Sequence, residues 1–245
     1  SVYQENIIID KKISLIGLNR KDTIIDGNKK DDVLYITHDN VTIDGFTIKN
    51  SGNSSYPNKD AGIDIRSKNN SIKNTTITGN NCYGIYMNKA DNTKIFNCSI
   101  LDNMNRGIYI THGKSYNLSF NTVTNHSHNI YLYSVDNSKI FSNSISRGSQ
   151  NGIYLGDGSY NNTIDNNIFS NNEHGTHVKG STENVISDNL YLNNDQGIYF
   201  CCGGENNLVY LNYFLNNNKH VYGYPINMFD NGNIGNFWDD YNGPD

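Results

Sequence analysis

Asp64 and its neighbours are the first residues in this chain whose types could do chemistry. Lys59 and Asp60 precede Asp64, and Arg66 follows it. Enzymes that cleave or epimerise acidic polysaccharides hold a cation, commonly Ca²⁺, with clustered carboxylates and place a base at the sugar C5. These four residues offer the required types, but no two carboxylates occupy equivalent positions in successive repeats.

A second group of acids and bases consists of Asp157, Glu173, His174, His177 and Lys179. It also lacks two carboxylates in register. We therefore expect scattered, solvated polar residues rather than an active centre, with Asp64, His177 and Lys179 as weak catalytic candidates. No cofactor is expected, and Ca²⁺ is the one ion that such carboxylates would suit.

Histidines and cysteines are the remaining candidates for a metal site. His128 and His174 lie two repeats apart, or roughly 9–10 Å if repeats stack about 4.8 Å apart, which exceeds the reach of one ion. Cys201 and Cys202 are adjacent and could form a thiophilic pair or a vicinal disulfide, whereas Cys82 lies about five repeats away. No metal site, copper included, and no disulfide framework is expected.

The element that positions these residues is a short repeat, typified by Gly-Ile-Tyr-Leu at residues 152–155. From Gly62 onward its copies recur in steps of 22 or 23 residues, and an earlier copy at Val33 precedes Gly62 by 29 residues. The copies begin at Gly62, Gly84, Gly107, Asn129, Gly152, Gly175, Gly197 and His220. A fixed period of this length is typical of a solenoid.

Each repeat contains three short strands. The first alternates inward and outward residues, and two more follow, for example at 93–95 and 98–100. Strands of about three residues joined by tight turns cannot form hairpins, but they can stack in parallel on the next repeat. The predicted fold is all-β: a right-handed, single-stranded parallel β-helix of about nine to ten coils.

Asparagines occupy two fixed positions in the repeat. The first column holds Asn121, Asn143, Asn167, Asn189 and Asn212, and the second holds Asn80, Asn103, Asn172, Asn194 and Asn217. We expect the first column to form a ladder of stacked amides. We expect the second column, and the glycines at 84, 107, 152, 175 and 197, to supply the left-handed conformation of a sharp turn.

The outward position of the Gly-Ile-Tyr-Leu strand carries aromatic rings. The predicted ligand-binding face is the column Tyr86, Tyr109, Tyr131, Tyr154, His177 and Tyr199. Rings on a regular ledge can stack on sugars or on another protein. The alternative is that they stack on one another and cover the sheet.

The whole chain, residues 1–245, is predicted to be one β-helix domain. Residues 1–31 form irregular first coils, 32–223 the regular coils, and 224–245 a C-terminal cap rich in aromatic residues, while 51–60 insert a loop. The net charge of −5 argues against nucleic acid and anionic membranes as partners. No apolar run approaches the roughly 20 residues that span a bilayer.

Three segments resemble the NosD-like parallel β-helix repeat proteins, also known as carbohydrate-binding/sugar-hydrolase (CASH) domains, which are plentiful among archaeal surface proteins. The segments are residues 5–27, the Gly-Ile-Tyr-Leu…Asn-Asn-Thr-Ile repeat, and residues 235–245. The resemblance implies the fold, and a place at the cell surface or in the periplasm. It implies no single activity, because the family includes enzymes, accessory proteins and structural modules.

These features predict a non-enzymatic extracellular or cell-surface module that binds a polysaccharide or surface glycan, or that is adhesive or structural. Other surface-protein domains and further copies stacked end to end are candidate partners. The alternatives are a polysaccharide lyase or epimerase acting on an acidic glycan, and, from the family's copper-linked name, a periplasmic copper-handling accessory protein.

Overall fold

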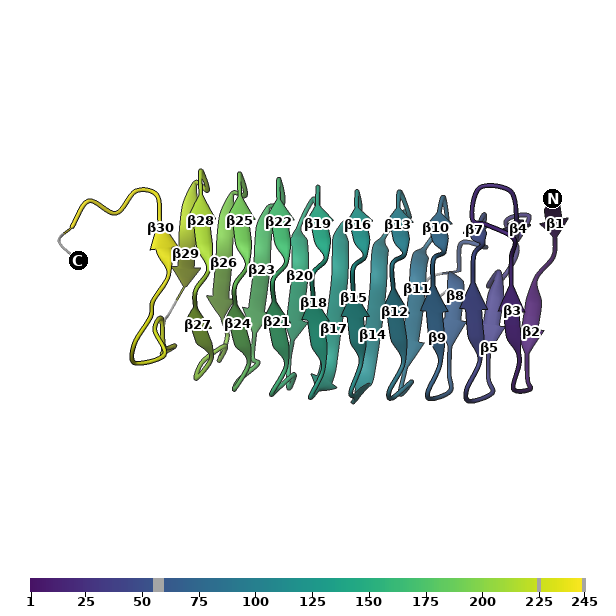
Figure 1. Cartoon of the computed structure of the whole chain (residues 1–245), viewed down its shortest axis with the longest axis horizontal. Helices are drawn as coiled ribbons and strands as arrows, with labels where there is room; N and C mark the ends of the chain where they lie inside the picture. Colours follow the sequence, from purple (N-terminus) through teal and green to yellow (C-terminus); the bar gives the residue numbers. More distant parts are fainter. Residues whose placement is uncertain (55–59, 224–225, 244–245) are drawn as a thin grey trace.

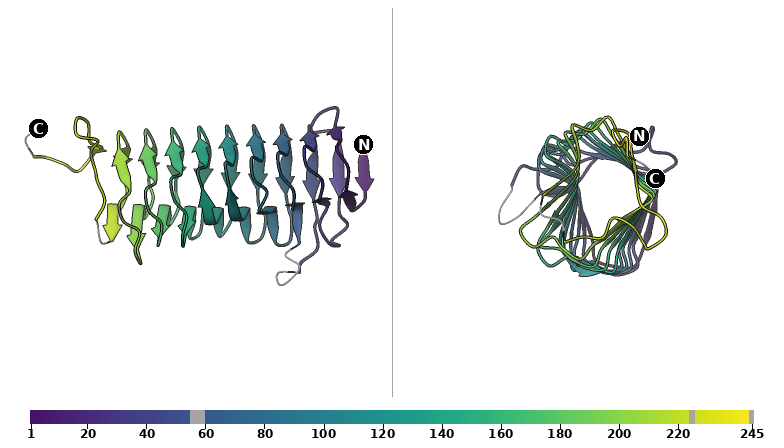
Figure 2. Two further views of the ribbon diagram at one scale, coloured as in Figure 1. Left: turned by 90° about the horizontal axis from the view of Figure 1, so that it is seen from below. Right: turned by 90° about the vertical axis from the view of Figure 1, so that its left-hand side faces the viewer.

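A computed structural model describes residues 1–54, 60–223 and 226–243, so Lys59 lies outside the described residues. Every strand pairing in it is parallel, and the described residues form no helix. The chain winds through three sheets in turn, which stack its coils into one elongated body with the termini at opposite ends (Figure 1). The view along the axis shows the sheets around a single interior (Figure 2). The predicted right-handed parallel β-helix is confirmed.

Each sheet collects one strand from every coil. Sheet A contains β1 (Val2–Gln4), β4 (Ile24–Asp26), β7 (Thr47–Lys49), β10 (Thr76–Thr78), β13 (Ser99–Leu101), β16 (Thr122–Thr124), β19 (Ser144–Ser146), β22 (Ile168–Ser170), β25 (Leu190–Leu192), β28 (Tyr213–Leu215) and β30 (Phe237–Trp238). Sheet B contains β2 (Ile7–Ile9), β5 (Leu34–Ile36), β8 (Ala61–Ile65), β11 (Tyr83–Asn88), β14 (Arg106–Lys114), β17 (His128–Asp136), β20 (Asn151–Gly156), β23 (His174–Lys179), β26 (Gln196–Cys201) and β29 (Lys219–Gly223). Sheet C contains β3 (Ser14–Ile16), β6 (Thr42–Asp44), β9 (Ser71–Lys73), β12 (Lys94–Phe96), β15 (Asn117–Ser119), β18 (Lys139–Phe141), β21 (Thr163–Asp165), β24 (Val185–Ser187) and β27 (Leu208–Tyr210).

Successive coils align without a shift in register. Ile108 pairs with Ile130, and Tyr109 with Tyr131. The aliphatic residues therefore form continuous inward columns that are fully buried. Burial of each such side chain stabilises the fold by roughly 1.5–3 kcal/mol. The same register places all outward residues of one repeat position in a line on the surface.

The first asparagine column forms the expected ladder. The amide of each member donates to Oδ1 of the next at 2.9–3.0 Å, from Asn121 through Asn143, Asn167, Asn189 and Asn212 to Asn236. The Cys98 backbone N–H donates to Asn121 Oδ1 and so begins the ladder. The backbone N–H of each member also donates to Oδ1 of the next at 2.9–3.0 Å, so the side-chain amides satisfy backbone donors at this bend.

The second asparagine column also forms a ladder, so the expectation that it supplies left-handed turns was wrong. Asn80, for example, donates to Asn103 Oδ1 at 2.8 Å. The left-handed residue is the one before it, such as Gly79 (φ 63°) or Asn171 (φ 56°). Glycines such as Gly107 are not left-handed either; a Cβ on Gly107 would lie 2.6 Å from the carbonyl oxygen of Asn129. They allow close approach of neighbouring coils.

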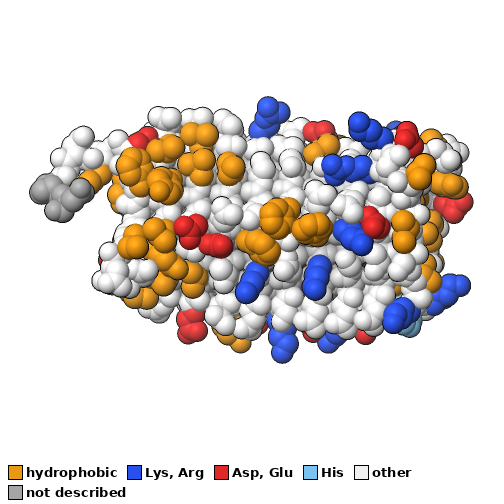
Figure 3. Space-filling model, in the orientation of Figure 1, with side chains coloured by type: hydrophobic (Ala, Val, Ile, Leu, Met, Phe, Trp, Pro, Cys, Tyr) orange, Lys and Arg blue, Asp and Glu red, His pale blue; other side chains and the backbone are white. Residues whose placement is uncertain are grey.

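Aromatic side chains cover the C-terminal end of the core. The ring of Trp238 stacks on Phe214, the outermost ring of its column, at 4.5 Å between centroids and 10° between planes. Phe229 contacts both Phe200 and Trp238, whereas Phe237 and Tyr241 are more than half exposed. Figure 3 shows hydrophobic side chains gathered at this end and over the middle of the molecule.

Candidate functional site

The outer face of sheet B carries the residues that the sequence pointed to. Its central column, here called the ring column, contains Tyr35, Asp64, Tyr86, Tyr109, Tyr131, Tyr154, His177, Tyr199 and Tyr222, all in register. A flanking column contains Tyr83, Arg106, His128, Asn151, His174, Gln196 and Lys219. Asn88 and Thr111 lie on the other flank, as do Lys179 and Cys201.

The rings pack against one another rather than standing free. Tyr131 and Tyr154 stack at 4.3 Å, and Tyr109 meets Tyr131 edge-on at 5.2 Å. Tyr86 and Tyr154 are only 2% and 8% exposed. The ring column is therefore partly covered by its own members. Its accessible part consists of the half-buried Tyr35, Tyr109, Tyr131, His177 and Tyr199 and the exposed Tyr222.

The side chain of Arg106 packs against the rings in the middle of the ring column. Its guanidinium lies 4.3 Å from the Tyr109 ring centroid and 4.2 Å from that of Tyr131. Cation–π contacts of this kind contribute about 0.5–2 kcal/mol each. Arg106 thus contributes its planar charge to the same face as the rings.

Unpaired polar atoms are concentrated on this face. Of the four buried side-chain nitrogen or oxygen atoms without a hydrogen-bond partner among the described residues, three belong to Asn88 (Oδ1), Arg106 (Nε) and Gln196 (Oε1). The fourth is Thr93 Oγ1. Buried polar groups are nearly always hydrogen-bonded, so three exceptions beside one column of rings call for an explanation.

An acidic cleft of about 480 Å³ lies at the N-terminal end of the same face. Its walls include Asp31, Asp32, Asp60 and Asp64, together with Arg66, Tyr35, Ile8, Ile7 and Asn6. Asp60 and Asp64 are buried, so the expectation of scattered, solvated carboxylates was wrong here. The 29-residue step brings Asp32 and Ala61 into contact, because the Ala61 N–H donates to Asp32 Oδ1 at 2.7 Å.

The carboxylates of the cleft differ in charge state. Arg66 donates to both oxygens of Asp64, at 2.6 and 2.8 Å, which favours the charged carboxylate. Burial, with the negative charges of Asp64 and Asp60, raises the pKa of Asp32 to about 8. The cleft therefore holds a protonated carboxyl group and an ionised one at neutral pH.

The second predicted group does not form an acidic centre. Glu173 and Asp157 are exposed, and Lys179 is half-buried. His177 packs against Tyr199, and burial together with nearby positive charges lowers its pKa to about 4. Its Nε2 lies 3.3 Å from Cys201 Sγ, a contact between two residues that the sequence singled out only separately.

Asn151 lies between His128 and His174 and contacts both of them. The amide of Asn151 lies 2.7 Å from His128 Nδ1, and its Oδ1 lies 3.0 Å from His174 Nδ1. Burial lowers the pKa of His128 to about 4. These two histidines are therefore neutral members of a hydrogen-bonded row on the flank of the rings.

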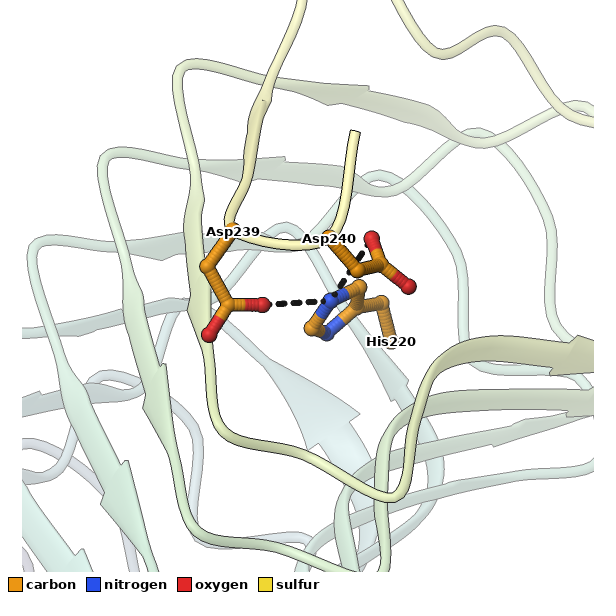
Figure 4. Close-up of side chains that lie close together, drawn as sticks. All are labelled: His220, Asp239 and Asp240. Atoms are coloured by element: carbon orange, nitrogen blue, oxygen red, sulfur yellow. Dashed lines mark ion pairs between the residues drawn. The ribbon is translucent and has the colours of Figure 1, made fainter. Parts of the chain in front are cut away.

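His220, Asp239 and Asp240 form the one group of three such side chains within 4.8 Å of one another in the described part of the chain (Figure 4). Both carboxylates contact Nε2 of His220, at 2.8 and 3.1 Å. Asn217 accepts from Asn194 through Oδ1, so its amide nitrogen faces His220 Nδ1 at 3.4 Å. The proton is thereby placed on Nε2, where both carboxylates accept it, and the group forms a clasp that fixes the C-terminal segment to the last coil.

Sequence reasoning did not find this clasp. His220 occupies a weak copy of the repeat, and Asp239 and Asp240 lie beyond the periodic region. The only feature of the sequence that pointed to these aspartates was the Trp-Asp-Asp-Tyr stretch at residues 238–241, within the C-terminal segment that resembles NosD-like proteins.

Comparison with known proteins places the chain among β-helix proteins. Residues 15–123 match the right-handed beta helix region, and residues 112–243 match the periplasmic copper-binding protein (NosD) family. None of the curated proteins compared with the chain matches it. The described residues contain no helix long and apolar enough to cross a membrane.

Several solved structures share the fold at low identity. They include the Dettilon tailspike protein (TM-score 0.63, 18% identity, 87% of this chain and 54% of that one). DFA-IIIase from Arthrobacter chlorophenolicus A6 in complex with DFA-III has a TM-score of 0.68 at 13% identity over 87% and 63% of the chains. The periplasmic alginate epimerase AlgG has a TM-score of 0.60 at 14% identity over 88% and 64%. The chain thus spans about half to two thirds of these proteins.

The NosD match covers more than half of the 245 residues and includes the second half of the ring column and the His220 clasp. With its three parallel sheets and 22- to 23-residue repeat, the chain belongs to the NosD family of right-handed β-helix proteins.

Proposed function

We propose that this chain is a glycan-binding module, located outside the cytoplasm, whose ligand lies along the outer face of sheet B. The glycan would run from the acidic cleft at Asp64 over the half-buried rings of Tyr109, Tyr131 and Tyr199. All of these belong to one column, so a linear chain can follow them across successive strands.

The unpaired polar atoms carry this proposal. A sugar presents many hydroxyl groups that both donate and accept. The side chains of Arg106, Gln196 and Asn88 would meet them by turning outward the buried atoms Nε, Oε1 and Oδ1, which have no partner in the folded chain. Binding sites combine aromatic surface with a few polar groups that fix orientation. Since the ring faces are occupied by neighbouring rings, contact would use ring edges and phenol hydroxyls.

The charge of the cleft favours an uncharged glycan. Four aspartates line it, and its one described cation, Arg66, is already bound to Asp64. A uronate would meet like charge there. This argues against the alternative of a lyase or epimerase for acidic glycans. One of the solved structures named above is an alginate epimerase, which supports a carbohydrate ligand in general.

A glycan array with the intact chain tests the proposal. The test variant carries Tyr109→Ala and Tyr131→Ala on sheet B. Its matched control carries Phe96→Ala and Phe120→Ala, an edge-on aromatic pair at 5.6 Å on sheet C. Binding of a neutral glycan that is lost only in the sheet B variant supports the proposal. No binding by the folded chain, or equal binding by both variants, contradicts it.

Cleavage of a glycan in the cleft is a second candidate, favoured by one observation. A carboxyl group whose pKa is raised to about 8 can donate a proton to a leaving oxygen, while an ionised carboxylate beside it acts as base or nucleophile. Asp32 and Asp64 have these charge states. Release of reducing ends from a bound glycan, abolished by Asp32→Asn, supports hydrolysis, whereas intact glycan after prolonged incubation excludes it.

A further inference from the structure

Three phenylalanine rings form a row on the outer face of sheet C, away from the proposed glycan face. Phe96 and Phe141 occupy the same outward position, one coil before and one coil after Ser119. The ring of Phe120 lies between them, edge-on at 5.6 Å from Phe96 and 5.8 Å from Phe141. Phe96 and Phe120 are 44% and 53% exposed. Contiguous exposed apolar surface is typical of an interaction site, whereas single exposed apolar residues are ordinary.

Phe120, at the centre of this phenylalanine row, has an unusual backbone conformation. Its φ is 57°, in the left-handed region, which disfavours a bulky side chain. The same position of the repeat holds Asn97 one coil earlier and Asn166 two coils later, both with φ of 52°. Asparagine adopts this conformation more readily than phenylalanine. A residue that is unfavourable in both its backbone conformation and its exposure is typical of a functional position.

Cationic side chains lie at the N-terminal end of the row. Lys73 precedes Phe96 in the same outward column and is ion-paired with Asp44 at 3.3 Å. Arg20 reaches this end from the first coils, because its guanidinium donates to the carbonyl oxygen of Asn97 at 3.4 Å. With two cations and one anion, this end of the row carries a net positive charge.

The C-terminal end of the row is acidic. Asp165 follows Phe141 in the column, and Asp188 is exposed close to it. Burial and the negative charge of Asp165 raise the pKa of Asp188. Neither carboxylate forms an ion pair with a cation in the described part of the chain. Figure 3 shows the hydrophobic patch over the middle of the molecule with cationic side chains on its N-terminal side and anionic ones on its C-terminal side.

The row is symmetric about β15. Phe96 and Lys73 lie one and two strands before β15, and Phe141 and Asp165 lie one and two strands after it. A two-fold axis along β15 would reverse the order of the coils in a second copy of the chain. It would place Phe96 against Phe141 of the second copy, and Lys73 against Asp165 of the second copy. In such an isologous interface each contact occurs twice.

An anionic membrane surface fits the row less well than a second copy does. It would attract Lys94 and Lys139, which lie beside the row, but it would repel Asp165 and Asp188. In a dimer the two lysines lie at the rim, where their long side chains extend into water and their repulsion is screened.

We propose that the phenylalanine row of sheet C is a dimer interface in which two copies of the chain pack side by side in opposite directions. The six rings form its apolar centre. At each end Lys73 of one copy pairs with Asp165 of the other. This interface lies apart from the ring column of sheet B and does not depend on a glycan.

Sedimentation equilibrium of the intact chain at increasing concentration tests the proposal, and we expect a monomer–dimer equilibrium. Phe120→Asn gives this position the residue of the preceding coil, so it should keep the fold and raise the dissociation constant at least about tenfold. The matched control Ile168→Ser removes an exposed apolar side chain from sheet A and introduces the residue found at Ser144 in the preceding coil. This control should dimerise as the parent chain does.

Charge reversal tests the direction of packing. Lys73→Glu and Asp165→Lys should each raise the dissociation constant at least about fivefold, and the double variant should recover parent-like dimerisation. A carbodiimide, which joins an amine to a carboxylate in contact with it, should link Lys73 to Asp165. These residues lie four strands apart, or about 19 Å within one chain, so this link can form only between copies. The ion pair of Lys68 with Asp91, at 2.9 Å, is the internal control for the reaction.

A parent chain that stays monomeric up to about 1 mM would overturn the proposal. So would a dimer that persists unchanged in Phe120→Asn, or one that gives the Lys68–Asp91 link without any link between Lys73 and Asp165. The glycan array scores loss of binding, and a change from dimer to monomer alters only the avidity, so the two proposals fail independently.

Discussion

The imidazole of His126 donates through Nδ1 to Oδ1 of Asn129 at 2.8 Å and accepts through Nε2 from the amide of Asn103 at 3.1 Å. Asn129 in turn donates to Asn172 Oδ1 at 3.2 Å, across the coil in which Gly148 has no side chain to contribute. The second ladder runs from Asn80 to Asn217. His126, together with Asn129 of sheet B, joins the two parts of this ladder.

His126 makes this ladder sensitive to acid. Burial lowers the pKa of His126 to about 4 from 6.5, and the protonated ring could no longer accept from Asn103. The folded pKa lies below the unfolded one, so this stability is present above pH 6.5 and is lost as pH falls through about 4. We expect a loss of up to about 3 kcal/mol, at about 1.4 kcal/mol per pKa unit. Denaturant unfolding at pH 7 and pH 4 measures this loss, and His126→Asn should remove it. An equal difference in unfolding free energy between the two pH values in the parent chain and in His126→Asn would contradict the account.

The contribution of Asp32 to the unfolding free energy should depend on pH in the opposite direction. Its folded pKa of about 8 lies above the ordinary 3.8, so its contribution is full below pH 3.8 and is lost as pH rises through about 8. Unfolding free energies between pH 5 and pH 9 should fall by at least about 2 kcal/mol. Asp32→Asn should reduce this decrease in unfolding free energy. Asp10→Asn, at an exposed position, should leave the decrease unchanged.

The first ladder should tolerate no loss of its donors. Asn167 donates to Asn189 Oδ1 at 3.0 Å, to the Ile140 carbonyl at 2.9 Å and to the Asp165 carbonyl at 3.0 Å. Asn167→Asp keeps the shape but replaces these donors with an acceptor, which should cost at least about 3 kcal/mol at pH 7. The neighbouring Asn166→Asp, at an exposed position, should change the unfolding free energy by about 0.5 kcal/mol or less. Similar losses in both variants would refute the ladder as a stabilising element.

The clasp should hold Trp238, the only tryptophan in the sequence, against the end of the core. His220→Phe keeps a ring next to Phe214 but removes the donor to Asp239 and Asp240. We expect about 1–2 kcal/mol of destabilisation and red-shifted tryptophan fluorescence in the folded protein. Asn218→Ala, at an exposed neighbouring position, serves as the control. Parent-like fluorescence in His220→Phe would show that the clasp does not fix this segment.

Much of the fold could be predicted because each coil repeats the same constraints. Alternation in residues such as Ile108 and Tyr109 fixes which face each side chain occupies, and a shift of one residue would turn every core residue outward. The asparagine positions were also visible in the sequence. The role of Asn80 was assigned wrongly, because amides and left-handed residues occupy adjacent positions and both are commonly asparagine.

The site was less predictable because it depends on contacts between columns. The ring column followed from the period, but its burial did not, since that depends on how Arg106 lies over Tyr109 and Tyr131. The cleft depends on the one irregular step, which brings Asp32 beside the strand of Asp64. The contact of His177 with Cys201 joins different repeat positions in successive coils, which a column-by-column comparison does not reveal.

Hydroxyl-radical footprinting of the intact chain, with and without the best ligand from the glycan array, tests the central claim most directly. Mass spectrometry reports the oxidation of each aromatic residue. We expect the glycan to protect Tyr109, Tyr131 and Tyr199 on sheet B and to leave Phe96 and Phe120 on sheet C unchanged. Protection of the sheet C pair alone, or no change at the three tyrosines with the glycan bound, would contradict the assignment of this face.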